Sequence, residues 1–282
     1  MSRRRTQVVV FPFDLFGSGG TAAGAELIAD ELREMLADNR AENVVTRARA
    51  YNSRVSLTEA SFVTPDDYHN WRATGQALAQ EASRSADLTL WLTGNHLGAL
   101  PLYDVLGQQQ AVPLIVQLDA HLDIHHFRDC HSTPTHGNFL LHVQGRLPPV
   151  VNVGHRDLLL PLEYIQHYYR RSIGVAEWVR DPQQVLNRLR SDIEPFPRVW
   201  LDLDCDVLDP AAFPAVARPV PFGLMPLDVL QLVEAVPAEK LAGLIVSEFD
   251  PGRDHNDRSL AILLWFVEYL LLRKYERRLP SP

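Results

Sequence analysis

Leu114-Ile115-Val116-Gln117-Leu118-Asp119-Ala120-His121-Leu122-Asp123 is the stretch of this sequence that determines its fold. Its first half is short and mostly apolar, which is typical of a strand buried in a parallel sheet. Asp119, His121 and Asp123 follow at every second position, and side chains at this spacing point to one face of an extended chain. The sequence therefore predicts a buried strand whose end presents three side chains of the kind that bind metal ions.

A second acidic stretch has the same character. The apolar residues Val199-Trp200-Leu201 lead into Asp202-Leu203-Asp204-Cys205-Asp206. Asp204 and Asp206 share a face, with Cα atoms about 6.6 Å apart at a rise of about 3.3 Å per residue. Carboxylates grouped at the end of an apolar strand lose hydration and repel one another unless cations lie among them. Solvent-facing acidic loops are the alternative, but two such stretches with an interspersed histidine favour metal binding.

Apolar runs alternate with segments of helical spacing along the whole chain, which predicts a parallel sheet covered by helices on both faces. No internal repeat, linker or composition break is found, so a single domain of residues 1–282 is expected. The expected strands are residues 6–13, 44–51, 88–92, 114–118, 150–154, 172–175, 199–201 and 241–246. The expected helices are residues 25–36, 65–86, 162–169, 182–189, a segment from 227, and a last helix capped by Asp257 and reaching about Tyr275.

Ligands of such sheets bind beyond the carboxyl ends of the strands. His96 follows one expected strand there and Glu248 follows another, while seven of the eleven histidines fall between His96 and His142. The candidate metal ligands are His96, Asp119, His121, Asp123, Asp204 and Asp206. This set is too large for one catalytic zinc ion but suits two ions that share carboxylates. Manganese is favoured, with zinc, iron and nickel as alternatives. Two such ions activate water, so hydrolysis is the expected chemistry.

Composition excludes several classes of partner. The chain has 282 residues and a net charge of −8, which does not suit a protein that binds nucleic acid or an anionic membrane surface. No segment approaches the ~20 apolar residues of a membrane span, and the amino-terminal apolar run is too short for a signal peptide. The two cysteines, Cys130 and Cys205, are interpreted as free thiols, so a reducing, cytoplasmic location is expected.

The motifs resemble those of the ureohydrolases, the arginase and agmatinase family. Asp119-Ala120-His121-Leu122-Asp123 is similar to the family's Asp-Ala-His-x-Asp motif, and residues 204–210, DCDVLDP, are similar to its Asp-x-Asp-x-x-Asp-Pro motif. Gly94-Asn95-His96 resembles its Gly-Gly-Asp-His-Ser motif. Glu248 follows the last expected strand, where the family has a glutamate that binds guanidinium. Together these matches cover residues 93–250 in the family's order.

The resemblance implies a three-layer α/β/α fold with a central, mainly parallel sheet and a centre of two manganese ions held by the six candidate ligands. It makes His136 the candidate proton shuttle and Glu248 the binder of the guanidinium, with Asp123 both ligand and catalytic residue. The implied reaction is hydrolysis of a C–N bond of a small guanidino compound to urea and an amine. It also implies a homo-oligomer, a trimer or a hexamer.

Departures from the family motifs bear on the substrate and the metal. Asn95 replaces an aspartate, Leu97 a serine and Asp202 a serine, which puts metal affinity or metal identity in question. His125 stands where arginases have an asparagine, and an acidic residue that meets the α-ammonium of arginine is replaced within residues 158–160. A guanidino substrate other than arginine is therefore expected.

Two rival functions remain open from the sequence. A metal-dependent amide deacetylase of the same broad fold would use one zinc ion and three protein ligands, which leaves His96 and the second acidic stretch without a role. A catalytically silent relative that serves as a binding or assembly subunit is the other rival, and Asn95 is the residue that favours it.

Overall fold

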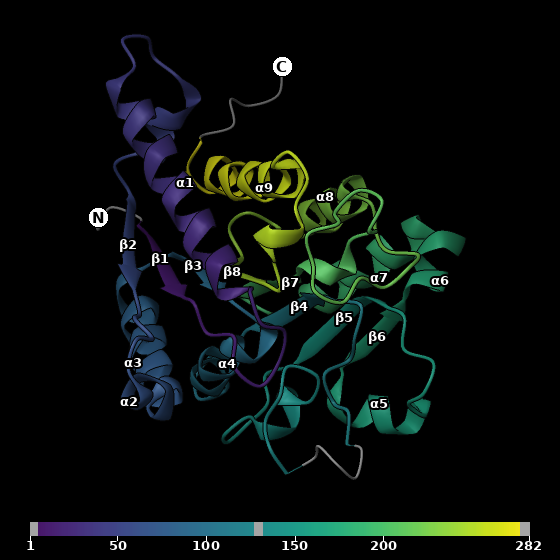
Figure 1. The fold of residues 1–282 in the computed structure, drawn as a ribbon. Helices are drawn as coiled ribbons and strands as arrows, with labels where there is room; N and C mark the ends of the chain where they lie inside the picture. Colours follow the sequence, from purple (N-terminus) through teal and green to yellow (C-terminus); the bar gives the residue numbers. More distant parts are fainter. Residues whose placement is uncertain (1–4, 127–131, 277–282) are drawn as a thin grey trace.

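The computed structural model describes residues 5–126 and 132–276, and the strands in them form one sheet in which every neighbouring pair is parallel. The order across the sheet is β2-β1-β3-β8-β7-β4-β5-β6 (Figure 1). The central, mainly parallel sheet expected from the sequence is confirmed. The strands are β1 (Thr6–Phe11), β2 (Val55–Glu59), β3 (Leu88–Thr93), β4 (Leu114–Leu118), β5 (Val150–His155), β6 (Arg171–Gly174), β7 (Val199–Asp204) and β8 (Leu241–Ser247).

Helices cover both faces of this sheet and make three layers (Figure 1). One face carries α1 (Ala22–Ala41), α6 (Val175–Arg180), α7 (Pro182–Ile193), α8 (Pro226–Ala235) and α9 (Arg258–Tyr275); the other carries α2 (Pro65–His69), α3 (Trp71–Ser85), α4 (Leu100–Gly107) and α5 (Leu162–Tyr168). The strands are apolar at consecutive positions because each face has its own core: Val8 and Val10 of β1 enter one, and Val9 and Phe11 enter the other.

The expected strand over residues 44–51 is wrong. Val44 and Val45 are exposed, a short 3-10 helix follows at Arg47–Ala50, and the edge strand is β2 instead. Among the described strands β2 pairs with β1 alone; its Val55 and Leu57 pack against the core, and Ser56, Thr58 and Glu59 are exposed. An edge strand needs only the weak alternation of partly buried and exposed residues seen in β2. Val44 and Val45 are a stronger strand signal in the sequence, so the strand was predicted there instead.

Two helix predictions also need correction. The segment 65–86 divides at Asn70 into α2 and α3, with Thr64 capping the first of them. Asp257 does not cap α9, because its backbone has a φ of 54° and its side chain makes no capping hydrogen bond. The carboxylate of Asp254 accepts instead from the backbone N–H groups of Ser259 and Leu260, at 3.0 Å each.

The register of the central strands brings four strand ends together. Leu118 of β4 pairs with Leu203 of β7, so Asp119 and Asp204 follow side by side. Asp204 pairs in turn with Ser247 of β8, the residue before Glu248. The carboxyl ends of β3, β8, β7 and β4 thus form one edge, where parallel sheets bind ligands. Within residues 5–126 and 132–276, no helix has the length and apolarity needed to cross a membrane.

Candidate metal centre

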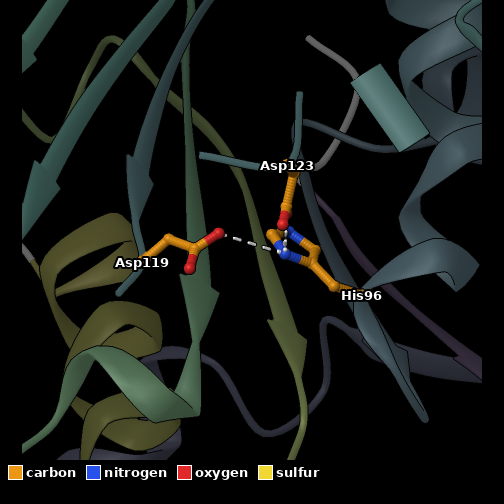
Figure 2. Close-up of side chains that lie close together, drawn as sticks. All are labelled: His96, Asp119 and Asp123. Atoms are coloured by element: carbon orange, nitrogen blue, oxygen red, sulfur yellow. Dashed lines mark ion pairs between the residues drawn. The ribbon is translucent and has the colours of Figure 1, made fainter. Parts of the chain in front are cut away.

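His96, Asp119 and Asp123 form a first group of buried side chains whose ligand atoms lie within 4.8 Å of one another (Figure 2). Nδ1 of His96 lies 2.8 Å from Oδ2 of Asp123 and 3.3 Å from Oδ2 of Asp119. Oδ2 of Asp204 is 3.1 Å from the same nitrogen. Four of the six predicted ligands therefore surround one point, and they come from the ends of β3, β4 and β7.

Asp119, His121 and Asp206 form a second group of the same kind. Nδ1 of His121 lies 2.9 Å from Oδ2 of Asp206 and 3.8 Å from Oδ1 of Asp119. Asp119 belongs to both groups and turns a different oxygen to each, which is the arrangement of a carboxylate that bridges two ions. The structure thus brings together all six residues predicted from the sequence as ligands.

An unusual backbone conformation at two residues orients their side chains toward the site. Asp123 has a φ of 49° and Glu248 a φ of 63°, both in the left-handed region that residues with a side chain rarely adopt. Glu248 is held there by its N–H, which donates to the carbonyl of Gly94 at 2.8 Å. Strain of this kind persists where surrounding structure enforces it, and it clusters at functional sites.

The pKa values of these carboxyl groups show that the negative charge of the cluster is unfavourable in the fold. Burial raises the pKa of Asp119 well above its usual range, and the charge of Asp123 raises it further. Burial and the charge of Asp206 act likewise on the pKa of Asp204. Burial disfavours ionisation of Asp206 too, but His121 beside it holds the pKa of Asp206 below the ordinary value. The cluster therefore demands positive charge, as protons or as cations.

The donor atoms fit divalent ions. Although Nδ1 of His96 and Oδ2 of Asp123 approach to 2.8 Å, neither makes a hydrogen bond of proper geometry, and both are buried. Buried polar atoms without partners are rare in proteins, and a metal ion between them would satisfy both. Carboxylate oxygens with a few imidazole nitrogens suit hard or borderline divalent ions.

Gln117 is a site residue that the sequence reasoning missed. It is fully buried in β4, where its Nε2 donates to Oδ2 of Asp119 at 3.1 Å. Its Oε1 accepts from the hydroxyl of Tyr169 at 3.0 Å and from Nδ2 of Asn152 at 3.2 Å. Gln117 thereby holds the carboxylate of Asp119, the residue shared by the two groups, in a fixed orientation. The available signal was a polar residue in the middle of an otherwise apolar strand.

Asp202 and Tyr103 hold His96 from the side away from its ligand nitrogen. Oδ2 of Asp202 lies 3.0 Å from Nε2 of His96 and accepts from the hydroxyl of Tyr103 at 2.5 Å. Burial and the charge of Asp202 keep the pKa of Tyr103 well above its usual range, so the phenol remains a donor. A carboxylate in this position fixes the tautomer of a histidine and makes its free nitrogen a better ligand.

We expect Asp202→Asn to weaken manganese binding by about 10- to 100-fold, because it removes a charge behind a ligating histidine without changing its packing. The loss should fall on one of two ions, since Asp202 contacts His96 and not His121. Calorimetric titration of the metal-free protein would show one weakened and one unchanged site. Equal weakening of both sites, with an unaltered circular dichroism spectrum, would contradict this role.

A cavity of about 210 Å³ opens directly above the two groups. His136 and Glu248 lie side by side in its wall, with Nδ1 of the histidine 3.1 Å from Oε1 of the glutamate. That oxygen also accepts from the backbone N–H of His96 at 3.0 Å. The cavity is lined by Ser18, His121, Asp123, His125, His136, Gly137, Asp204, Asp206, Val216, Arg218 and Glu248.

Several loops contribute residues to the wall of this cavity. Ser18 brings the glycine-rich turn of residues 17–21 to the cavity wall. His125 lines the cavity, and its Nε2 lies 2.9 Å from Oδ2 of Asp157. His131 and Cys130 lie outside the described residues. Val216 and Arg218 were missed, because a proline-rich loop carries no spacing that would identify them.

Asn95, the departure that raised doubt about metal binding, does not contact the ligand groups through its side chain amide. Its Nδ2 donates to the carbonyl of Leu15 at 3.0 Å and so ties the glycine-rich turn to the end of β3. A Cβ on Gly17 would stand 2.5 Å from that same nitrogen and 3.0 Å from Cγ of His136. The asparagine therefore shapes the cavity wall and supports the loop beside His136.

Comparison with known proteins gives concordant results. The sequence profile of the Arginase family matches residues 4–272. The chain is 28% identical over 249 residues to a guanidinopropionase of Pseudomonas aeruginosa, covering 84% of this chain and 77% of that protein. It is 27% identical over 229 residues to an arginase of Agrobacterium fabrum, covering 72% of this chain and 70% of that protein. The solved structure of proclavaminate amidino hydrolase from Streptomyces clavuligerus superposes with a TM-score of 0.77 at 23% identity, covering 96% of this chain and 92% of the other.

Proposed function

This chain belongs to the arginase family, and from that premise we propose that it is a ureohydrolase acting on a small guanidino compound with two divalent ions, most suitably manganese. The products are urea and an amine. The observation that carries this proposal is the pair of ligand groups that share Asp119 at the floor of the cavity facing Glu248. When bound, a pair of ions would supply Lewis acidity and a water molecule activated for attack.

Glu248 is the proposed guanidinium binder. Its carboxylate is buried, lines the cavity and is oriented by the backbone N–H of His96. A carboxylate and a planar guanidinium form paired hydrogen bonds, which would hold the guanidinium carbon above the ligand groups. Asp123, beside it in the cavity wall, is proposed to serve as a ligand and to orient the attacking water.

His136 is the proposed proton shuttle. About a quarter of its side chain is exposed, and it lies between the cavity and solvent with Nδ1 on Glu248. An imidazole can act as both general acid and general base, so it can donate a proton to the departing amine and recover one from water. The contact with Glu248 places this proton beside the nitrogen that leaves.

Arginine itself is not the proposed substrate. The relatives are named for several substrates, among them arginase, guanidinopropionase, agmatinase and formimidoylglutamase, so family membership alone does not select one. At the mouth, His125 is held by Asp157, and the next residues, Leu158 and Leu159, are exposed apolar side chains. The carboxylate of Asp157 is already engaged by His125 and by the backbone N–H groups of Leu159 and Leu160, so it is not offered to an α-ammonium group. We also propose a cytoplasmic homo-oligomer, a trimer or a hexamer, with no nucleic-acid or membrane partner.

The rival functions account for less of the structure. A deacetylase with one zinc ion leaves the second ligand group, around His121 and Asp206, without a purpose. A silent binding subunit has no need for a buried cluster of carboxylates whose pKa values are raised by burial and mutual repulsion. Such a cluster is costly to fold, and a bound metal pair offsets that cost.

We expect elemental analysis of the purified protein to find two metal equivalents per chain, and the manganese-loaded protein to release urea from at least one member of a panel of guanidino compounds. Glu248→Gln should reduce kcat/KM by about 100-fold or more while both metal equivalents remain, because it removes the charge that pairs with the guanidinium. One metal equivalent, or acetate release from acetylated amines without urea, would favour the deacetylase.

A further inference from the structure

The cavity wall carries charges of both signs. It carries the carboxylates Asp123, Asp204, Asp206 and Glu248, and it also carries the guanidinium of Arg218, the one arginine among its lining residues. Arg218 is exposed, and no hydrogen bond or ion pair of its guanidinium is found in residues 5–126 and 132–276. An arginine this close to acidic groups, and paired with none of them, has its donors available for a ligand.

The loop that carries Arg218 is held in place from several sides. The carboxylate of Asp209 accepts from the N–H groups of Ala211 and Gly223 at 2.9 Å each, which closes the loop at its base. The partly buried guanidinium of Arg156 donates to the carbonyl of Val220 at 3.2 Å and to that of Asp206 at 2.6 Å. Asp250 N–H donates to the carbonyl of Ala215 at 2.9 Å.

The sequence around the arginine adds stiffness. Arg218 precedes Pro219, which restricts its backbone to extended conformations, and follows the buried Val216 of the cavity wall by two residues. The backbone from which the guanidinium projects is therefore fixed relative to the metal centre. A rigid backbone at this residue reduces the entropy lost when the side chain binds a ligand.

Charge balance indicates what that ligand carries. Asp119, Asp123, Asp204 and Asp206 bear four negative charges when ionised, and two divalent ions would neutralise them. Two fixed charges of the cavity then remain, the carboxylate of Glu248 and the guanidinium of Arg218. One charge of each sign in the wall of a small cavity matches a substrate that is itself a zwitterion.

We propose that Arg218 binds the carboxylate of an ω-guanidino acid whose guanidinium is bound by Glu248; this assignment rests on the proposed ureohydrolase function. Arginine forms paired hydrogen bonds with carboxylates through its planar fork, which gives both affinity and orientation. A guanidino compound that ends in an ammonium group instead meets a like charge at this point. The substrate class is therefore acidic at the end away from the reaction.

The test uses the manganese-loaded full-length protein and three series of compounds matched in spacer length: ω-guanidino acids, neutral alkylguanidines, and aminoalkylguanidines such as agmatine. At the best spacer length, the acid should have a kcat/KM about 10- to 100-fold above that of the neutral compound, the range expected for a charged hydrogen-bonded pair. The amine should fall below the neutral compound. Most of the difference should lie in KM, because Arg218 does not touch the reacting carbon.

Arg218→Glu should reverse the order, raising the amine above the acid, with each compared with the neutral alkylguanidine in the same variant. Arg218→Lys should keep the preference for acids but reduce it, since one ammonium cannot reproduce the paired contact. The matched control is Arg84→Glu, the same charge change at an exposed residue at the end of α3, directly before β3 begins and thus at the far edge of the sheet. It should leave all three series unchanged.

The outcomes separate the two proposals. Urea release from neutral or amine-ended guanidines with no preference for acids, and no change in Arg218→Glu, would overturn the role of Arg218 and leave the ureohydrolase function standing. Release of formamide from formimidoylated amino acids, with the same loss in Arg218→Glu, would support the carboxylate contact and overturn the guanidino assignment. If no compound is hydrolysed, calorimetric binding of guanidinobutanoate decides: weaker binding in Arg218→Glu supports the contact, and equal binding overturns it.

Discussion

Asp119→Asn is expected to abolish binding of both metal ions and to eliminate hydrolysis, with the largest effect of any single substitution in this protein. Asp119 turns one oxygen to the group of His96 and the other to the group of His121, so its loss removes a ligand from each. Removing even an outer partner of a metal ligand costs about 10- to 100-fold in affinity, and a shared ligand costs more. Calorimetric titration with manganese and urea release would measure the two effects.

The same substitution should leave the metal-free protein as stable as the unaltered chain, or more stable. Burial already raises the pKa of Asp119, which shows that its charged form is disfavoured in the fold. An asparagine of the same shape removes that repulsion and can still accept from Nε2 of Gln117. Thermal unfolding in chelator should therefore show an unchanged or higher Tm, and addition of manganese should no longer raise it.

Asp30→Asn is the matched control for this experiment. Asp30 is an exposed residue of α1 whose carboxylate pairs with Arg33, and it is not part of either ligand group. It should bind two manganese ions and keep its activity. Two bound ions and ordinary turnover in Asp119→Asn would show that the shared carboxylate is not the bridge inferred from its position.

The stability of the metal-free protein should fall as the pH rises from about 6 toward 10. Burial opposes protonation of His121, but Asp206 raises the pKa of this histidine from 6.5 to about 10. A group with a raised pKa binds its proton more tightly in the folded state than in the unfolded state. Its contribution to stability is complete below 6.5 and is lost as the pH passes through about 10.

The carboxylates of the cluster act in the same direction. The pKa values of Asp119 and Asp204 are raised above 3.8, so their protonated forms stabilise the fold and ionisation at higher pH destabilises it. Asp206, whose pKa is lowered, makes its contribution above 3.8 and does not change further in this pH range. Bound cations replace the lost protons, so the increase in Tm on adding manganese should grow with pH.

Calorimetric unfolding of the protein in chelator and with manganese, at a series of pH values, measures both curves. The metal-loaded protein is the internal control, because titrations elsewhere in the chain affect both forms alike. A metal-free protein more stable at alkaline pH than at pH 6, or a manganese-induced increase in Tm that shrinks with pH, would show that the cluster does not hold the protons assigned to it.

The sequence predicted that the side chains of the ligand groups would meet because they follow the ends of neighbouring strands, which a parallel sheet brings together without any knowledge of side-chain packing. The same rule predicted that Glu248 would reach this edge. The order of the strands in the sheet was not required to predict that these side chains lie at this edge. The extended alternation expected beyond these strands is wrong in detail: β4 ends at Leu118, Asp123 has a φ of 49°, and Asp206 lies in a 3-10 helix.

Contacts made across layers were not predictable in this way. Tyr103 reaches Asp202 from α4, and Gln117 meets Tyr169 from beyond α5, through distances in sequence of about 50 to 100 residues. No rule of sequence spacing predicts such pairs, because they depend on how the helices pack on the sheet. Arg218 was missed for a related reason, since loops have no periodicity and their exposed arginines are common.

The loop between β7 and α8 carries Arg218, yet it contributes none of the six metal ligands, which sit on strand ends or directly after them. Asp209 closes its base, while Arg156 and the N–H of Asp250 hold its middle through the backbone carbonyls of Val220 and Ala215, which a residue of any type supplies. Residues 214–221 could thus be exchanged between relatives as a cassette while the reactive centre stays intact. Grafting that cassette from a relative with a different substrate offers a direct route to re-engineering selectivity in this scaffold.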